Sequence, residues 1–270
     1  MIGSAQKLLM ARAGVGGGSN PWSLSTATAT GVTLDVSSDI GGNATSFFID
    51  DGGTHLYVTY NSNVYQYTLS SAWDLSTATY DSVSFDPTAN ITYAFNVTFK
   101  PDGTEMYIGD FITNPTKIGR FTLSSAWDLS TASFTSVEDV GNESRGVAFS
   151  ANGTKMFMSE PDVYQYSLSS AWDTTTESYD SVSLATNSGK SASGLCLTDS
   201  GTRLFVSVIN FDGSGAQIEG FTLSSANDLS TATYDQTYSG SEDIRHAYFK
   251  PDGTKFFASV QSSTIREYIM

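Results

Sequence analysis

Short runs in which apolar and polar residues alternate follow one another from Trp22 to Met270. Such alternation is typical of β-strands with one buried face, and the runs are rich in Phe, Tyr, Val, Ile and Thr. The stretch from Ala94 to Val137 shows one full round, with AFNVTF, EMYIGDF, KIGRFTL and TASFTSV separated by turn residues. No window carries sustained helical periodicity, apart from a turn or two near residues 5–13. The pattern predicts an all-β fold of short antiparallel strands.

Two motifs alternate along these strands. The first contains a Gly-Thr pair, as in KPDGTEMYI at Lys100–Ile108, and its glycine stands at positions 53, 103, 153, 201 and 253. The second is SSAWDLSTATY at Ser70–Tyr80, with variants at 124–134, 169–179 and 224–234 and a shortened copy, WSLSTATAT, beginning at Trp22. Self-similarity with a period of about 50 residues indicates a solenoid, a propeller or an array. Four short strands per period are typical of a propeller blade.

The phase of the repeat predicts how the ring closes. With the four strands of a unit labelled a to d from the inside outwards, the Gly-Thr turn joins a to b, and SSAWDLST joins c to d. The chain then begins with a lone d strand at Ala27–Asp35 and ends with a c strand at Ile265–Met270. Joining the two completes a fifth blade and removes the open sheet edges. We therefore expect a five-bladed β-propeller over residues 22–270, with a linear β-solenoid as the alternative.

Residues 1–21 differ in composition from the repeats. The segment MIGSAQKLLMARAGVGGGSNP has a short apolar stretch, interrupted by Lys7 and Arg12, and then a glycine-rich hinge. It lacks the basic-then-apolar order of a secretory signal, so we expect synthesis and retention in the cytosol. We interpret the segment as a docking arm, with a disordered tail or an expression scar as the alternatives.

Composition and charge narrow the range of partners. The 270 residues carry a formal net charge of −15, and 13% of them are aromatic, which is ample material for a core. Nucleic acid is an unsuitable partner for so acidic a chain, because binding phosphates requires clustered Lys and Arg. No apolar run reaches the roughly 18–20 residues of a membrane-spanning helix, so we expect no membrane insertion. The one cysteine, Cys196, lies in the apolar segment GLCLT, which predicts a buried, inert thiol.

The second motif repeats a Trp-Asp pair that allows more than one interpretation. Its members are Trp22, Trp73, Trp127 and Trp172, with Asn227 in the remaining unit, and Asp74, Asp128, Asp173 and Asp228. The tryptophans suit either stacking on sugars or packing between blades, and we favour packing, because blade contacts require a large aromatic at an equivalent place in each unit. The aspartates are expected to accept hydrogen bonds from nearby backbone amides, with a calcium site as the weaker interpretation.

Both motifs lie at one end of the strands, and the connections at the other end differ from unit to unit. Positions that only hold the fold can be copied, whereas an asymmetric binding site needs positions that diverge. We therefore expect the variable end to bind a sugar or a polar protein surface, with drift of unconstrained loops as the alternative. The candidate ligand-binding residues are Asn96, Phe111, Asn114, Arg145, Asn187, Phe211, Asp212, Arg245 and His246.

The predicted innermost strands argue against a glycosidase. That reaction needs two acids a few ångströms apart, yet ATSFFI, AFNVTF, SRGVAF, ASGLCL and IRHAYF contain no Asp or Glu. Arg145, Arg245, His246 and Asn96 are instead expected at the mouth of the channel, where they suit an anion or, alternatively, where the arginines stack on aromatic rings. The chain has only two histidines, too few for a histidine-rich metal site. We therefore expect no metal, and we also expect no catalytic activity and no cofactor.

The segments FKPDGTEMYI and RFTLSSAWDLSTASF together resemble a propeller repeat family that is common in bacterial and phage proteins. The likeness spans residues 22–270, and its main departures are Asn227 in place of Trp and TTTE at Thr174–Glu177 in place of LSTA. The arrangement is also similar to YVTN- and WD-type propellers. Its likeness to the tachylectin-type lectin concerns blade number alone, because the sugar-binding residues of that lectin have no counterparts here.

The resemblance and the arm imply a non-enzymatic phage structural protein, made in the host cytoplasm and located in the virion. Residues 1–20 would attach it to other virion proteins, and the variable end would bind a glycan or receptor on the host surface. A capsid or tail decoration protein without a receptor role and a lectin-like bacterial propeller are the alternatives, and a glycoside hydrolase is the least favoured.

Overall fold

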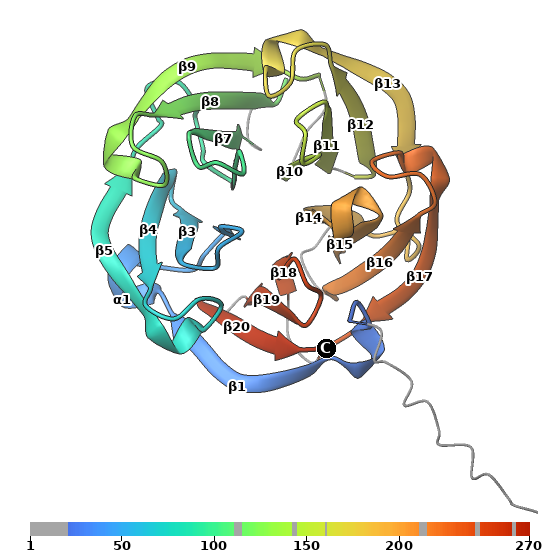
Figure 1. Ribbon diagram of the computed structural model, residues 1–270, viewed down its shortest axis with the longest axis horizontal. Coiled ribbons are helices and arrows are strands. Elements are labelled where there is room, and N and C mark those ends of the chain that lie inside the picture. Colours follow the sequence, from blue (N-terminus) through green and yellow to red (C-terminus); the bar gives the residue numbers. More distant parts are fainter. Residues whose placement is uncertain are drawn as a thin grey trace, which may run out of the picture.

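Five four-stranded antiparallel sheets surround a central axis in the computed structural model of the chain (Figure 1). The structure describes residues 21–110, 115–141, 145–159, 161–210, 215–240, 244–260 and 263–270. In the first four sheets the strands follow the order of the chain from the axis outwards. The fold is therefore the five-bladed β-propeller that the repeat period predicts.

Each blade takes its strands from one period of the sequence. The first contains β2 (Ser46–Ile49), β3 (His55–Tyr60), β4 (Asn63–Leu69) and β5 (Ala78–Phe85). The second contains β6 (Asn96–Phe99), β7 (Glu105–Asp110), β8 (Lys117–Leu123) and β9 (Ala132–Asp139). The third contains β10 (Gly146–Phe149), β11 (Lys155–Ser159), β12 (Val163–Leu168) and β13 (Glu177–Leu184). The fourth contains β14 (Ser191–Thr198), β15 (Arg203–Ile209), β16 (Gln217–Leu223) and β17 (Ala232–Tyr238).

The fifth blade combines the two ends of the chain. Its strands are β18 (Ile244–Phe249), β19 (Lys255–Val260), β20 (Thr264–Ile269) and β1 (Thr28–Asp35). The N-terminal strand runs antiparallel to the C-terminal one, with Thr28 opposite Ile269 and Asp35 opposite Thr264. The predicted closure is confirmed, and it leaves β20 paired on both sides instead of exposing an open edge.

The end of the ring that carries the Gly-Thr turns and the SSAWDLST segments is called the repeat face, and the opposite end the variable face. At the repeat face each tryptophan lies on the turn glycine of its own blade. A Cβ atom added to Gly103, for example, would stand 2.3 Å from the Trp127 ring. The other pairs are Gly53 with Trp73, Gly153 with Trp172 and Gly253 with Trp22.

The same tryptophans join neighbouring blades. In every unit an aromatic residue follows the turn glycine by four positions. At four of the five seams the tryptophan of the next blade packs near it, and at the remaining seam, beside Phe157, the next blade has Asn227. The ring-centroid distances are 6.1 Å for Trp22–Phe205, 6.1 Å for Trp73–Phe257, 6.4 Å for Trp127–Tyr57 and 6.2 Å for Trp172–Tyr107. The two tyrosines also donate their hydroxyls to the backbone oxygens of Trp127 and Trp172. These contacts confirm packing between blades as the role of the tryptophans.

The residues after each tryptophan form a short 3-10 helix. The helices of the repeated segment are η1 (Leu24–Thr26), η2 (Leu75–Thr77), η3 (Leu129–Thr131), η4 (Thr174–Thr176) and η6 (Leu229–Thr231). In η2, η3, η4 and η6 the preceding aspartate accepts a hydrogen bond from the second helical amide, as Asp74 does from Ser76. This is the backbone role predicted for the aspartates.

At three seams a glutamine side chain accepts a hydrogen bond from a leucine amide of the next blade, and at one of them the glutamine comes from a different strand. Gln66 on β4 accepts a hydrogen bond from the Leu129 amide of the second blade at 2.9 Å, and Gln165 accepts the corresponding bond from Leu229 at 2.8 Å. The fourth blade has Gly220 at the equivalent position, and Gln236 from the adjacent strand fills the space. Its side chain then accepts from the Leu24 amide at 2.7 Å, so the contact is preserved.

One element was not expected from the sequence. The connection between β1 and β2 contains α1 (Ser37–Ile40), a four-residue helix that begins where Asp35 accepts a hydrogen bond from the Ser37 amide. Gly41 ends it in the left-handed conformation, with φ at 84°. A single turn is too short to produce a periodic pattern, which is why only a loop could be predicted there.

Deletion of residues 22–36 removes β1 and its pairing with β20. Because the fifth blade then lacks its outer strand, we expect the cooperative unfolding transition to disappear. Thermal unfolding followed by circular dichroism measures this. Deletion of residues 1–20 is the matched control and should leave the transition in place. A soluble 22–36 deletion with an unchanged melting temperature would contradict the closure.

Candidate functional site

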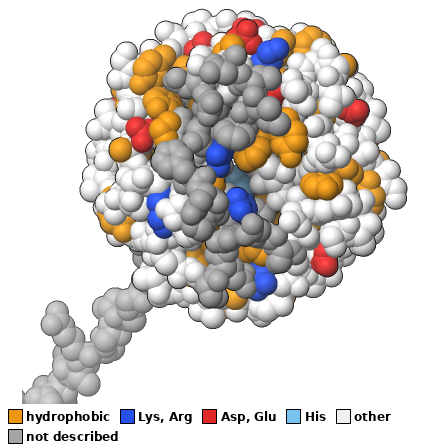
Figure 2. All heavy atoms as spheres, turned by 180° about the vertical axis from the view of Figure 1, so that it is seen from behind, with side chains coloured by type: hydrophobic (Ala, Val, Ile, Leu, Met, Phe, Trp, Pro, Cys, Tyr) orange, Lys and Arg blue, Asp and Glu red, His pale blue; other side chains and the backbone are white. Residues whose placement is uncertain are grey.

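The channel opens at the variable face through a ring of structurally equivalent residues. One residue from each blade, eight positions before the turn glycine, contributes to it: Thr45, Phe95, Arg145, Ser193 and Arg245. Together with Asn43, Ala44 and Ile209 they line a cavity of about 240 Å³. Figure 2 shows this face, with Lys and Arg side chains near its centre. The five positions are structurally equivalent, so each blade contributes a different side chain to the same place in the ring.

Two arginines dominate the chemistry of this mouth. Arg145 precedes β10, and Arg245 lies on β18, with Ser193 from the intervening blade between them in the ring order. Ser193 donates to the backbone oxygens of Ser207 and Arg245, at 3.0 and 3.1 Å, which holds the neighbouring inner strands together. No carboxylate is among the described lining residues of the cavity. Arg145 and Arg245 are therefore the charged side chains of the described lining, and guanidinium groups suit an anionic ligand.

A buried polar tier lies one residue deeper along the inner strands. It contains Ser46, Asn96, Gly146, Gly194 and His246. Asn96 donates to the Ser46 hydroxyl at 3.1 Å and accepts from the Val147 amide at 3.2 Å, so it connects three blades. The His246 ring covers Gly194, where an added Cβ would stand 2.4 Å from a ring carbon.

This tier corrects the expected position of two candidate residues. Asn96 is 3% exposed and His246 is 4% exposed, so neither lies at the mouth of the channel beside the arginines. Burial lowers the pKa of His246 to about 4. A hydrogen bond with the Leu195 backbone raises the pKa, but its effect is smaller than that of burial. The imidazole is therefore neutral at pH 7 and supplies no positive charge to an anion at the mouth.

The remaining candidates lie away from the cavity or outside the described residues. Asn187 is exposed on the connection between β13 and β14. Its backbone amide and that of Ser188 donate to the buried carboxylate of Glu219, at 2.7 and 2.8 Å, which fixes this loop to β16. Phe111, Asn114, Phe211 and Asp212 lie outside the described residues.

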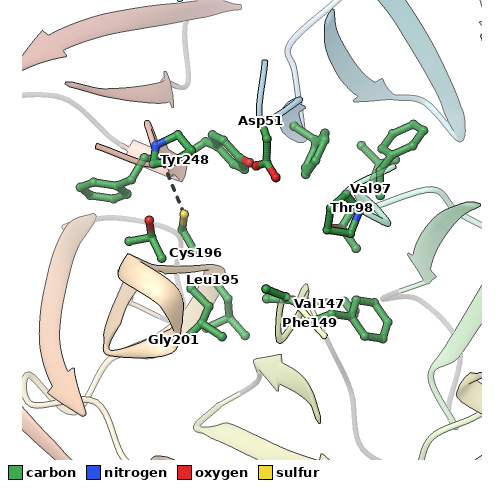
Figure 3. Close-up of a pocket in the computed structure, with 18 of the residues that line it drawn as sticks. Asp51, Val97, Thr98, Val147, Phe149, Leu195, Cys196, Gly201 and Tyr248 are labelled. Atoms are coloured by element: carbon green, nitrogen blue, oxygen red, sulfur yellow. Dashed lines mark hydrogen bonds between the residues drawn. The ribbon is translucent and has the colours of Figure 1, made fainter. Parts of the chain in front are cut away.

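A second and larger cavity of about 350 Å³ occupies the channel at the repeat face. Figure 3 shows Asp51 and Tyr248 on one side of it, with Val147 and Phe149 lying opposite. Cys196 also lines this cavity; its buried thiol accepts a hydrogen bond from the Phe249 amide at 3.4 Å, and burial raises its pKa to about 12. The thiol is buried as predicted, and it stays protonated at neutral pH.

Sequence reasoning missed this cavity, because it treated both repeated motifs as purely structural. A signal was present in the turn itself. Two positions before the turn glycine, the five units have Asp51, Pro101, Ala151, Asp199 and Pro251, all of which line the cavity. The repeat face is therefore less uniform than its motifs indicate, and two of its five turns bring a carboxylate to the axis.

Neither a metal-binding cluster nor a membrane-spanning helix is found in the described ranges. Within them, no group of three or more His, Cys, Asp and Glu side chains is arranged to hold a metal ion. No helix that the structure describes has the length and apolar character needed to cross a bilayer.

Comparison with known proteins finds similarity in fold to solved structures. No protein-family model matches the chain, and no curated protein matches it either. Among solved structures, the chain is similar to a protein from Desulfotomaculum acetoxidans that is described as functionally unknown, with a TM-score of 0.47 and 12% identity. The match covers 78% of this chain and 61% of that one, so this chain spans less than two thirds of its length.

Protonation of His246 should destabilise the fold in acid. Because the pKa of His246 is about 4 when folded and near 6.5 when unfolded, the unfolded state binds the proton first as the pH falls. We expect this to cost about 3 kcal/mol of unfolding free energy between pH 7 and pH 4. Urea unfolding of the wild type and of His246→Gln at both pH values measures it, because the variant lacks this contribution. An equal loss of stability in both proteins would contradict the assignment.

Proposed function

We propose that the chain is a non-enzymatic binding protein of a phage virion, which presents its variable face to a glycan or receptor on the host surface. The observation that carries the binding role is the ring at the mouth of the channel. Five equivalent positions hold five residues of which two are arginines, and these two line one cavity. The ligand that fits is an anionic group, such as the carboxylate or sulfate of an acidic sugar.

The size of the cavity supports recognition of a single terminal group. About 240 Å³ accommodates part of a sugar residue. The net charge of the whole chain, −15, disfavours long polyanions and favours a ligand that carries a single local charge.

The inner wall supports binding in preference to glycoside hydrolysis. That chemistry requires two carboxyl groups that flank the scissile bond. The described lining of the variable-face cavity offers guanidinium, hydroxyl and amide groups in their place. Such groups bind and orient an anion but do not supply the acid and base of the reaction.

The location in a virion rests on the resemblance of the repeats to a family found in phage proteins and on the composition of residues 1–20. In this proposal the arm attaches to other virion proteins and the propeller meets the host. The described chain begins at the repeat face, where Trp22 packs on Gly253, and this is the end of the ring opposite to the variable face.

An array of sialylated, uronate-containing and sulfated glycans beside their neutral counterparts tests the ligand class. We expect the fluorescently labelled full chain to bind anionic members, and the double variant Arg145→Ser/Arg245→Thr to bind about tenfold more weakly or less, because it loses both charge-assisted contacts. Each substitution introduces a residue that another blade carries at this position, Ser193 or Thr45, so the fold should tolerate it.

Lys250→Ser is the matched control, because it removes one positive charge at the repeat face and introduces the residue of the third blade, Ser150. It should bind like the wild type. Equal binding by the double variant would contradict a role of Arg145 and Arg245 in binding. If the protein binds no anionic glycan on the array, the proposed ligand class is wrong.

The virion role is tested separately in cells where the encoding phage multiplies. We expect the tagged full chain to co-purify with the particles, and a variant that lacks residues 1–20 to stay in the soluble fraction. Immunoblots of gradient-purified particles measure both. Retention of the shortened variant would assign attachment to the propeller, and absence of the full chain from the particles would exclude a virion component.

A further inference from the structure

We propose that the repeat-face cavity binds a small organic ammonium ion, with aromatic rings around the cation and the Asp51 carboxylate at its rim. This inference does not rest on the proposed function, because the site lies at the opposite end of the axis from the arginine mouth.

Size and shape are the first support. The cavity of about 350 Å³ is lined by residues of all five blades, with Asn96 and His246 among them. A volume of this order suits one small molecule. Because all five blades contribute to its lining, the cavity surrounds a compact head group from several sides.

Aromatic walls are the second support. The rings that line the cavity are Phe47, Phe48, Phe99, Phe149, Trp172, Tyr248 and Phe249. Phe48 stands edge-on to Tyr248, with their ring centroids 5.2 Å apart, and it also packs against Phe99 at 5.3 Å. The electron-rich faces of such rings attract cations, and the attraction grows where water is excluded.

Charge is the third support, and it distinguishes this cavity from the mouth at the variable face. Asp51 and Asp199 line it, and its described lining contains no lysine or arginine. Figure 3 places the Asp51 carboxylate beside Tyr248 at the cavity. Loss of water around Asp51 and the charge of Asp50 together raise the pKa of the Asp51 carboxyl. A bound cation would compensate both effects, because it favours the ionised carboxylate.

His246 offers a polar contact for the rest of the ligand. His246 lines the cavity, is nine-tenths or more buried, and its Nδ1 has no hydrogen-bond partner within the described ranges. A buried polar atom in this state is costly unless a ligand or water reaches it. A hydroxyl group attached to the ammonium ion is a suitable donor, since the neutral imidazole can accept with Nδ1.

Choline and its uncharged isostere 3,3-dimethylbutan-1-ol test the inference directly. The two molecules share shape and hydroxyl group and differ in the central nitrogen and its charge. Titration calorimetry of the full chain at low ionic strength should show saturable binding of choline at millimolar concentrations and at least about tenfold weaker binding of the isostere. Equal binding of both, or no saturable binding of choline, would overturn the inference.

Asp51→Asn removes the rim charge in an exposed turn and should weaken choline binding about tenfold. Asp139→Asn on the outer strand β9 makes the same change of charge outside the cavity and should leave the affinity unchanged. Equal effects of the two substitutions would show a general effect of net charge and would overturn the site.

Tyr248→Leu tests the aromatic wall, with Tyr248→Phe as the control that keeps the ring. We expect choline binding to be lost in the first and retained in the second, and retention in a folded Tyr248→Leu protein would contradict an aromatic site. A comparison with phosphocholine separates two sources of the same ammonium group. Tighter binding of phosphocholine would indicate a phosphorylated surface polymer, and tighter binding of choline a free ammonium compound.

Discussion

In four of the five blades a tryptophan ring packs onto the bare backbone of a turn glycine, and the geometry of the propeller depends on this contact. The contact between Gly103 and Trp127 excludes any side chain at the turn, and the other side of the indole meets Phe48 and Tyr57 of the preceding blade. One residue thus fixes both the turn within a blade and the seam between two blades. This double role explains why the sequence repeats the pair so closely, since a change at either position disturbs two blades.

Once the seam fixes the angle between blades, equivalent positions of the inner strands become neighbours around the axis. Residues that stand fifty positions apart in the chain, such as Asn96 and Ser46, then form one tier. Two cavities of opposite character lie along the axis, one lined by arginines and the other by carboxylates and aromatic rings. The residues that line the channel can therefore differ from blade to blade while the contacts between blades are kept.

The sequence was sufficient to predict strand order, blade number and closure, because turn glycines and tryptophans mark every unit and the phase shows which strand is missing. It could not show how deep each inner residue lies. Asn96 and His246 follow Phe95 and Arg245 directly, yet they are buried while Arg245 lines the mouth, and this depends on the radius of the ring. The replacement of a Gln66-type contact by Gln236 was also hidden, since it crosses from one strand to the next.

The pairing of β1 with β20 also determines how the propeller responds to mechanical force. Trp22 enters at the repeat face, and β1 runs from Thr28 there to Asp35 at the variable face. Tension applied between Trp22 and a partner held at the variable face would act along this strand. The hydrogen bonds to β20 lie across that direction, so they are sheared together instead of being peeled one after another. The strand that closes the ring is therefore oriented to resist a pull on the end of the chain that precedes it.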